Sequence, residues 1–236
     1  MNSITLLIIE AIICFIVLII IYAKYKINGL YLYAIVLAIL SSLMSLKQIP
    51  IDNYDINLGI IPFIMIFTIS NIIIQKKGVE ETKKILLTTL STSIISYIIL
   101  LLISYMNPSN INLFTNASYD NIFTSSMRIY FTNIVTLLYS LLLNNKLYYY
   151  LKLIKNNILI SNLFSSIIIN FIASILFGLI GYTFVLETID IIKLIMMRYL
   201  IGLILGFLST ILIYITKYIK EEKWGINVWE QVKKNK

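Results

Sequence analysis

The sequence predicts an all-α, polytopic integral membrane protein: a helical bundle of about seven transmembrane helices, six plus an extra N-terminal one. Hydrophobic residues make up 59% of the 236 residues, and charged residues make up 13%, about half the share of a soluble domain. The mean hydropathy is +0.91. Seven apolar runs come close to the roughly 20 residues with which a helix crosses a bilayer.

These runs must be helices, because a chain in lipid has to satisfy its backbone hydrogen bonds internally. The first run has no basic region before it and no small-residue cleavage site after it. We therefore interpret it as a retained helix and not as a signal peptide. The predicted spans are Ser3–Tyr22, Leu30–Leu46, Asn57–Ile74, Ile85–Met106, Ile122–Leu143, Ile158–Gly181 and Ile191–Ile215.

The distribution of basic residues among the connecting segments predicts the orientation. The segments 23–29, 75–84 and 144–157 and the chain after Ile215 hold 2, 4, 3 and 6 Lys or Arg residues. The three alternate segments hold only Lys47. Basic segments stay in the cytoplasm, so the N-terminus is predicted outside and the C-terminus inside. We expect a multi-pass protein of the cell (plasma) membrane, with residues 1–236 as a single transmembrane domain and 216–236 as an amphipathic cytoplasmic tail.

Composition argues against several function classes. The net charge is +8, and most basic residues are clustered between the apolar runs. They form no basic stripe with interleaved aromatic residues, so a nucleic-acid partner is not expected. Histidine is absent and Cys14 is the single cysteine, which argues against a metal or haem cofactor. The spans lack a Ser–His pair, paired aspartates and a Walker loop. We therefore expect no enzyme and no cofactor.

Strongly polar side chains within the spans are few, and such residues usually face a bundle interior or a wet cavity. Asn71 and Gln75 are four residues apart and share one helix face. Apart from Glu10, no acid lies inside a span. The candidate substrate-binding residues are Asn71, Gln75, Arg128, Asn170 and Arg198, with Lys47 and Asn144 at predicted helix ends.

Each candidate also has a purely structural interpretation. Carboxamides such as Asn71 and Asn170 can hold helices together by hydrogen bonds. Lys47 can extend its ammonium group to the membrane surface, and Asn144 can be a loop residue. The aromatic residues that could stack on a planar solute, or simply pack, are Phe63, Phe67 and Tyr199.

With these positions in view, the stretch "SNIIIQKKGVEETKK" (Ser70–Lys84) is similar to the end of the third helix in the queuosine precursor transporter family, also called the vitamin uptake transporter family. These small membrane proteins import deazaguanine precursors of the tRNA nucleoside queuosine. The family helix typically ends in Thr-Asp…Glu-x-Tyr-Gly followed by a charged run. The resemblance continues through "MRIYFTNIVTLLYSLLLNNKLYYYLK", "NLFSSIIINFIASILFG" and "MMRYLIGLILGFLSTILIY".

The resemblance assigns roles by position. Arg128 stands at the family's arginine, and Arg198 stands where the family usually has lysine. The usual acids are replaced by Asn71, Gln75, Asn144 and Asn170, and a usual glutamine by Leu141. The resemblance thus implies a transport site that keeps its hydrogen-bonding groups and loses its titratable protons. Coupling through Glu10, coupling to another ion and facilitated diffusion all stay open.

Two functions are therefore predicted. The first is a membrane transporter that imports a small, planar, nitrogen-rich solute, a queuosine precursor. The alternative is a substrate-binding or permease membrane subunit of an ATP-driven uptake or export complex. The expected partners are the solute and the lipid bilayer, and a homo-oligomer or an ATPase partner stays open.

Overall fold

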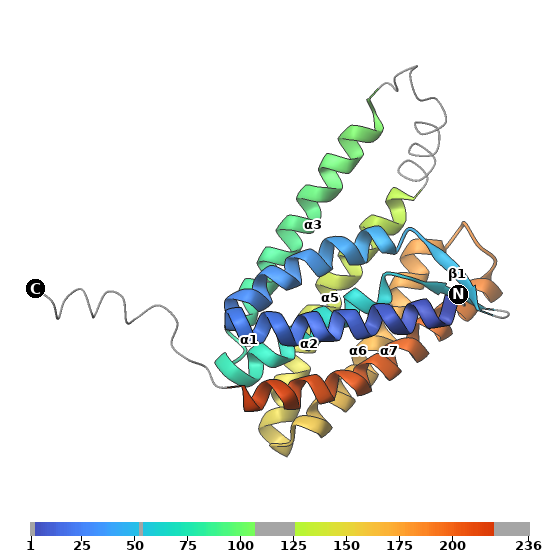
Figure 1. Ribbon diagram of the computed structural model, residues 1–236. Coiled ribbons are helices and arrows are strands. Elements are labelled where there is room, and N and C mark those ends of the chain that lie inside the picture. Colours follow the sequence, from blue (N-terminus) through green and yellow to red (C-terminus); the bar gives the residue numbers. More distant parts are fainter. Residues whose placement is uncertain (1–2, 52–53, 107–125, 220–236) are drawn as a thin grey trace, which may run out of the picture.

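The computed structural model describes residues 3–51, 54–106 and 126–219 (Figure 1). Within these ranges the chain forms a helical bundle with one β-hairpin at one end, which we call the hairpin end. The elements are α1 (Ser3–Met44), β1 (Gln48–Ile51), β2 (Tyr54–Asn57), α2 (Ile60–Lys77), α3 (Thr82–Ser104), α5 (Met127–Lys155), α6 (Ile158–Tyr182) and α7 (Thr188–Tyr218).

Helix α1 consists of two limbs that reverse direction at Lys26, whose backbone is non-helical with φ 54° and ψ −141°. Figure 1 shows the limbs running side by side, and the Tyr33 hydroxyl donates to the carbonyl of Cys14 across them over 3.1 Å. The two predicted N-terminal helices correspond to these limbs. The predicted connection at 23–29 is too long, because Lys26 is the residue within α1 that departs from helical geometry.

The β-hairpin corrects the predicted start of the next helix. Asn57 was expected to begin a transmembrane helix, but it lies in β2 and pairs with Gln48 of β1. The helix α2 begins at Ile60, immediately after Gly59. A Cβ at Gly59 would lie 2.1 Å from Oγ of Ser45 and 2.3 Å from the carbonyl oxygen of Ser41. Only glycine lets the start of α2 approach the end of α1 so closely.

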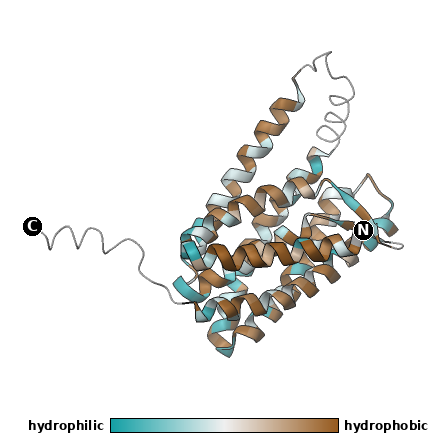
Figure 2. Ribbon diagram, in the orientation of Figure 1, coloured by the Kyte–Doolittle hydropathy of each residue, from teal (hydrophilic) through white to brown (hydrophobic). Residues whose placement is uncertain are grey.

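Helix α2 is the centre of the bundle. All its residues from Ile60 to Ile74 are buried, and it packs against α1, α5 and α7. Large apolar side chains are instead exposed on α1, α3, α6 and α7. Lipid can cover these side chains, because its acyl chains are also apolar. Figure 2 shows this hydrophobic colouring along the helices, with hydrophilic residues gathered near helix ends and in the hairpin.

Five of the described helices, α1, α2, α3, α6 and α7, are long and apolar enough to cross a membrane. Helix α5 is not among them, although it spans 29 residues. Its sequence is interrupted by polar side chains, several of which are buried in the bundle. The predicted span Ile122–Leu143 and the predicted orientation therefore remain predictions.

Helix α5 also extends further than predicted. The segment 144–157 was expected to be a connecting loop, but α5 continues to Lys155 and α6 begins at Ile158. Asn156 ends α5 in the left-handed conformation, with φ 44°. The side chain of Asn157 accepts hydrogen bonds from the backbone N–H groups of Leu159 and Ile160, at 2.9 and 3.3 Å. Asparagine suits both positions, and the two residues make a tight, capped turn.

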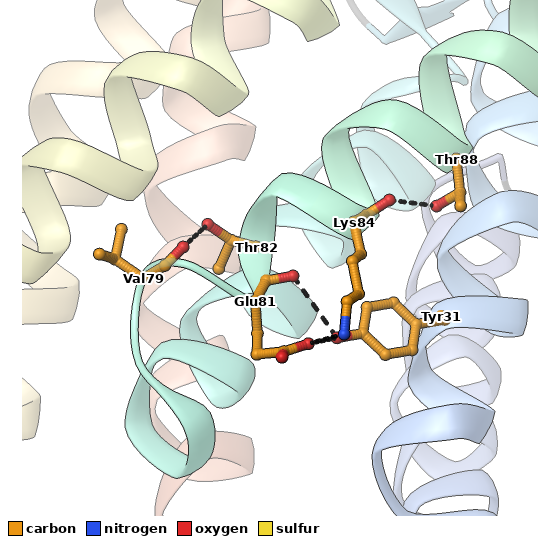
Figure 3. Close-up of polar contacts among 6 residues, drawn as sticks. All are labelled: Tyr31, Val79, Glu81, Thr82, Lys84 and Thr88. Carbon is orange, nitrogen blue, oxygen red and sulfur yellow. Dashed lines mark hydrogen bonds and ion pairs between the residues drawn. The ribbon is translucent and has the colours of Figure 1, made fainter.

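The connection between α2 and α3 is attached to α1 by a small polar cluster (Figure 3). The Tyr31 hydroxyl donates to Oε2 of Glu81 over 3.0 Å, and Nζ of Lys84 lies 2.7 Å from the same oxygen. The hydrogen bond from Lys84, and then that from Tyr31, hold the pKa of Glu81 below its ordinary value. We call this side of the bundle the Gly78 end, since Gly78 ends α2 there with φ 89°.

The segment 107–121, which connects the predicted spans Ile85–Met106 and Ile122–Leu143, lies outside the described residues, as does the part of the predicted tail beyond residue 219.

Candidate functional site

Three buried asparagines, each from a different helix, form a connected chain that we call the asparagine network. Asn144 of α5 donates through Nδ2 to Oδ1 of Asn71 on α2, over 2.9 Å. Asn71 donates through its own Nδ2 to Oδ1 of Asn162 on α6, also over 2.9 Å. All three side chains are at most 1% exposed, so these bonds lie in the protein interior.

The network ends on α7, where Nδ2 of Asn162 lies within hydrogen-bond distance of three oxygens. These acceptors are the carbonyl of Gly206 at 3.0 Å, Oγ of Ser209 at 3.0 Å and Oγ1 of Thr210 at 2.8 Å. A carboxamide has one acceptor and two donor hydrogens, so Asn162 both accepts from α2 and donates to α7. The chain of bonds therefore links α5, α2, α6 and α7.

A second pair of polar contacts joins α2 to α5 beside the network. Nε2 of Gln75 donates to the hydroxyl of Tyr148 over 2.6 Å, and Oγ of Ser70 donates to Oδ1 of Asn145 over 2.6 Å. The predicted shared face of Asn71 and Gln75 is thus the face that α2 turns toward α5. Lys152 adds a contact to the carbonyl of Ile74 over 3.3 Å, one turn nearer the Gly78 end.

Asn170 lies two turns along α6 from Asn162 and contacts α7 at two glycines. Its Nδ2 donates to the carbonyl of Gly202 over 2.8 Å. A Cβ at Gly202 would lie 3.0 Å from Cγ of Asn170, and a Cβ at Gly206 would lie 2.8 Å from Cβ of Ser166. These glycines let α6 and α7 approach closely, which gives buried asparagines access to the α7 backbone.

Arg198 lies nearer the hairpin end, 2% exposed, in what we call the arginine site. Its Nη1 donates to Oδ1 of Asn57 over 3.2 Å. Its guanidinium carbon lies 3.9 Å from the ring centre of Phe177 and 4.9 Å from that of Phe63. Its Nε and Nη2 have no hydrogen-bond partner in the part of the chain that the structure describes. Phe63 therefore packs on the arginine, while Tyr199 packs edge-on against Phe171.

Lys47 and Arg128 lie apart from the asparagine network. Lys47 precedes β1, and its carbonyl accepts the N–H of Leu58, which places it beside the arginine site at the hairpin end. Arg128, in the first turn of α5, is exposed and donates to the carbonyls of Ile180 and Thr183 at 2.8 to 3.1 Å. The predicted span Ile122–Leu143 puts Arg128 six residues inside a helix, but α5 begins one residue before it.

Several buried polar residues were not among the predicted site residues. Asn57 was missed because it was predicted to begin a transmembrane helix. Asn145 and Tyr148 were missed because residues 144–157 were predicted to be a connecting loop. Thr136 and Ser140 are fully buried, and their hydroxyls have no hydrogen-bond partner among the described residues. Their spacing from Asn144 at four-residue intervals was a usable signal, because such residues follow one side of a helix.

A groove of about 640 Å³ lies over α5 and α6, but it is separate from these sites. Its lining is almost entirely apolar and includes Leu143, Leu147, Ile168 and Ile172. None of the asparagine network lines it. The described residues also contain no group of three or more His, Cys, Asp or Glu side chains that could hold a metal ion.

An apolar helical bundle whose polar side chains are bonded to one another inside is the arrangement of a multi-pass membrane protein. A family model described as "Putative vitamin uptake transporter" matches residues 57–216, which is more than half of the chain. The protein therefore belongs to the vitamin uptake transporter family, and the resemblance seen in the sequence is confirmed. No curated protein and no solved structure matches the chain.

Proposed function

We propose that this protein imports a small, planar, nitrogen-rich solute across the plasma membrane, and that the solute is a queuosine precursor, a deazaguanine derivative. The observation that carries the proposal is the asparagine network, whose carboxamides from α2, α5 and α6 lie together inside the bundle. Each carboxamide offers an acceptor and a donor pair, the combination that reads the edge of a purine-like base.

The substrate-binding residues in this proposal occupy two levels of the bundle. Asn71, Gln75 and Asn144 lie at the level of the network, and Arg198 lies nearer the hairpin end, with Asn170 between the two levels on α6. The carboxamides bond to one another, so a solute that binds them takes the place of one carboxamide partner with its own donor or acceptor. Such an exchange is inexpensive, because no buried polar group is left unpaired.

Lys47 and Arg128 are proposed to act at the entrance. Lys47 is placed at the hairpin end, and Arg128 holds the start of α5 against the end of α6 through its bonds to Ile180 and Thr183. With the N-terminus outside, as the basic connections favour, the solute enters at the hairpin end and leaves at the Gly78 end. The protein acts as a carrier without catalytic chemistry, and it needs no cofactor.

The proposal is tested by uptake of labelled deazaguanine precursors into cells that cannot synthesise queuosine. We expect the wild-type chain to restore queuosine in tRNA and Asn71→Ala to abolish it at equal membrane expression. Ser91→Ala is the matched control, since Ser91 is exposed on α3 and bonds only to its own helix at the carbonyl of Thr88. No uptake by well-expressed wild-type protein would overturn the assignment of the solute.

Purified protein in lipid vesicles separates the carrier from the alternative, a membrane subunit of an ATP-driven complex. Uptake by the reconstituted chain alone supports a self-sufficient transporter. Uptake that requires an added ATPase subunit and ATP would replace the carrier with the alternative.

A further inference from the structure

Arg198 carries two hydrogen-bond donors that no group among the described residues satisfies. The residue is 2% exposed, and its Nε and Nη2 have no partner within residues 3–51, 54–106 and 126–219. No ion pair joins it to any Asp or Glu in the part of the chain that the structure describes. Unsatisfied donors on a buried charged group are strongly destabilising, so these two donors point to a ligand that the protein binds.

The two free donors lie on one edge of the guanidinium group. Nε–H and the adjacent N–H of Nη2 point in parallel, and this edge receives two neighbouring acceptor atoms at once. The remaining nitrogen, Nη1, is already bound to Asn57. Asn57 is itself held in place, since its Nδ2 donates to the carbonyl of Ser45 over 2.7 Å and its Oδ1 accepts from the N–H of Gly59 over 3.1 Å.

The aromatic neighbours decide the shape of the ligand. Phe177 and Phe63 lie 3.9 and 4.9 Å from the guanidinium carbon, so both rings pack on the group whose edge is free. A ligand that meets the free edge must approach in the plane of the guanidinium, which favours a flat group. The site already contains one buried cation, so a second positive charge at this edge would be repelled in a poorly screened interior.

We propose that Arg198 selects solutes that present two neighbouring acceptor atoms on one edge of a planar ring, and that it rejects solutes with a cationic amine at that edge. The inference rests on the proposed transport function and deepens it. Among deazaguanines, the 7-cyano compound places a ring carbonyl and a nitrile nitrogen on the same edge. The 7-aminomethyl compound places an ammonium group there. An aromatic carboxylate such as nicotinate offers two neighbouring acceptors of another kind, the oxygens of one carboxylate, on a different ring.

The test is equilibrium binding of these three probes to the full-length protein purified in detergent. We expect either the 7-cyano compound or nicotinate to bind at least tenfold more tightly than the 7-aminomethyl compound. Arg198→Lys keeps the charge and loses the two-donor edge. It should therefore raise the Kd of the preferred probe at least tenfold. Lys193→Arg on the same helix is the control, because Lys193 is exposed and paired with Asp190.

The outcomes separate this inference from the proposed function. Binding of nicotinate but of neither deazaguanine, with loss in Arg198→Lys, would support the acceptor edge and overturn the deazaguanine assignment. Equal or tighter binding of the 7-aminomethyl compound would overturn the inference and leave deazaguanine transport standing. Binding of none of the three probes to wild-type protein would overturn both. If Arg198→Lys fails to fold, the relative Kd values of the three probes for the wild-type protein still test the inference.

Discussion

Nδ2 of Asn71 donates to Oδ1 of Asn162 over 2.9 Å, and this bond joins the central helix α2 to α6. Asn162 has no freedom to reverse its amide, because its Nδ2 already faces three oxygens of α7. The group at position 71 must therefore donate toward α6 and accept from Asn144 on α5 at the same time. A protonated carboxyl can do both, whereas a carboxylate can only accept.

This requirement predicts the behaviour of Asn71→Asp, which introduces the acid that the resemblance to the family implies at this position. The variant should be nearly as stable as wild type at pH 5, where a protonated carboxyl donates to Asn162. It should lose about 1–3 kcal/mol by pH 8, where Oδ1 of Asn162 loses its donor. Thermal unfolding in detergent at both pH values measures the difference.

Asn71→Leu is the control for this experiment, since it cannot donate at any pH and should be destabilised equally at pH 5 and pH 8. An Asn71→Asp variant that is more stable at pH 8 than at pH 5 would contradict the assigned direction of the hydrogen bonds.

The close approach of α6 and α7 at Gly206 gives a second prediction. A Cβ at Gly206 would lie 2.8 Å from Cβ of Ser166, so Gly206→Ala should separate the helices and cost about 1–3 kcal/mol. Adding Ser166→Gly removes the clashing atom and should recover part of this loss. Gly181→Ala is the matched control, because its new Cβ would meet Ile129 at an ordinary 3.4 Å. A double variant less stable than Gly206→Ala alone would show that the contact is not the cause.

The contacts of Glu81 predict a small pH dependence at the Gly78 end. The pKa of Glu81 is lowered by Lys84 and Tyr31, so the carboxylate stabilises the folded state above its unfolded pKa. That contribution is lost as the pH falls through the lower, folded pKa. Thermal unfolding between about pH 6 and pH 3 should therefore show a shallower acid decline for Glu81→Gln than for wild type. Glu80→Gln, at an exposed partner of Lys83, should leave the decline unchanged.

The predicted orientation can be measured with single cysteines, since Cys14 is the natural one and Cys14→Ala removes it. Tyr54→Cys lies on the exposed part of β2, and Glu80→Cys lies in the exposed connection after α2. A membrane-impermeant maleimide should label Tyr54→Cys in intact cells and Glu80→Cys only after permeabilisation. Labelling of Glu80→Cys but not Tyr54→Cys in intact cells would show that the predicted orientation is inverted.

The rare polar residues within the helices could be located from the sequence, whereas the rotation of uniformly apolar helices could not. The span Ile158–Gly181 matches α6 within one residue, and Asn71, Gln75 and Asn144 do lie on facing helices. Arg128 and Arg198 looked alike in the sequence, yet one is exposed and the other is buried. A helix that is apolar on every side carries no signal for which face meets lipid, so rotation is decided by packing.

The β-hairpin and the break at Lys26 could not be predicted for a different reason. The strands QIPI and YDIN are four residues each, too short for a periodic pattern to separate them from a loop. Lys26 is neither glycine nor proline, so nothing at that position indicates a reversal. Both features depend on contacts between segments, such as the bond from Tyr33 to Cys14.

The turn between α5 and α6 bears on how the bundle could open. Asn156 and Asn157 join two long helices without slack, and both helix ends there are capped, so the pair should move as one stiff lever. The connection between α2 and α3 is less constrained. Gly78 in this connection has φ 89°, and no atom lies within 4 Å of where its Cβ would be. Rocking of the α5–α6 pair against α2 would break both bonds of Asn71, to Asn144 and to Asn162, while leaving each helix intact. Release of the solute would then require sliding of preformed parts and no melting of secondary structure.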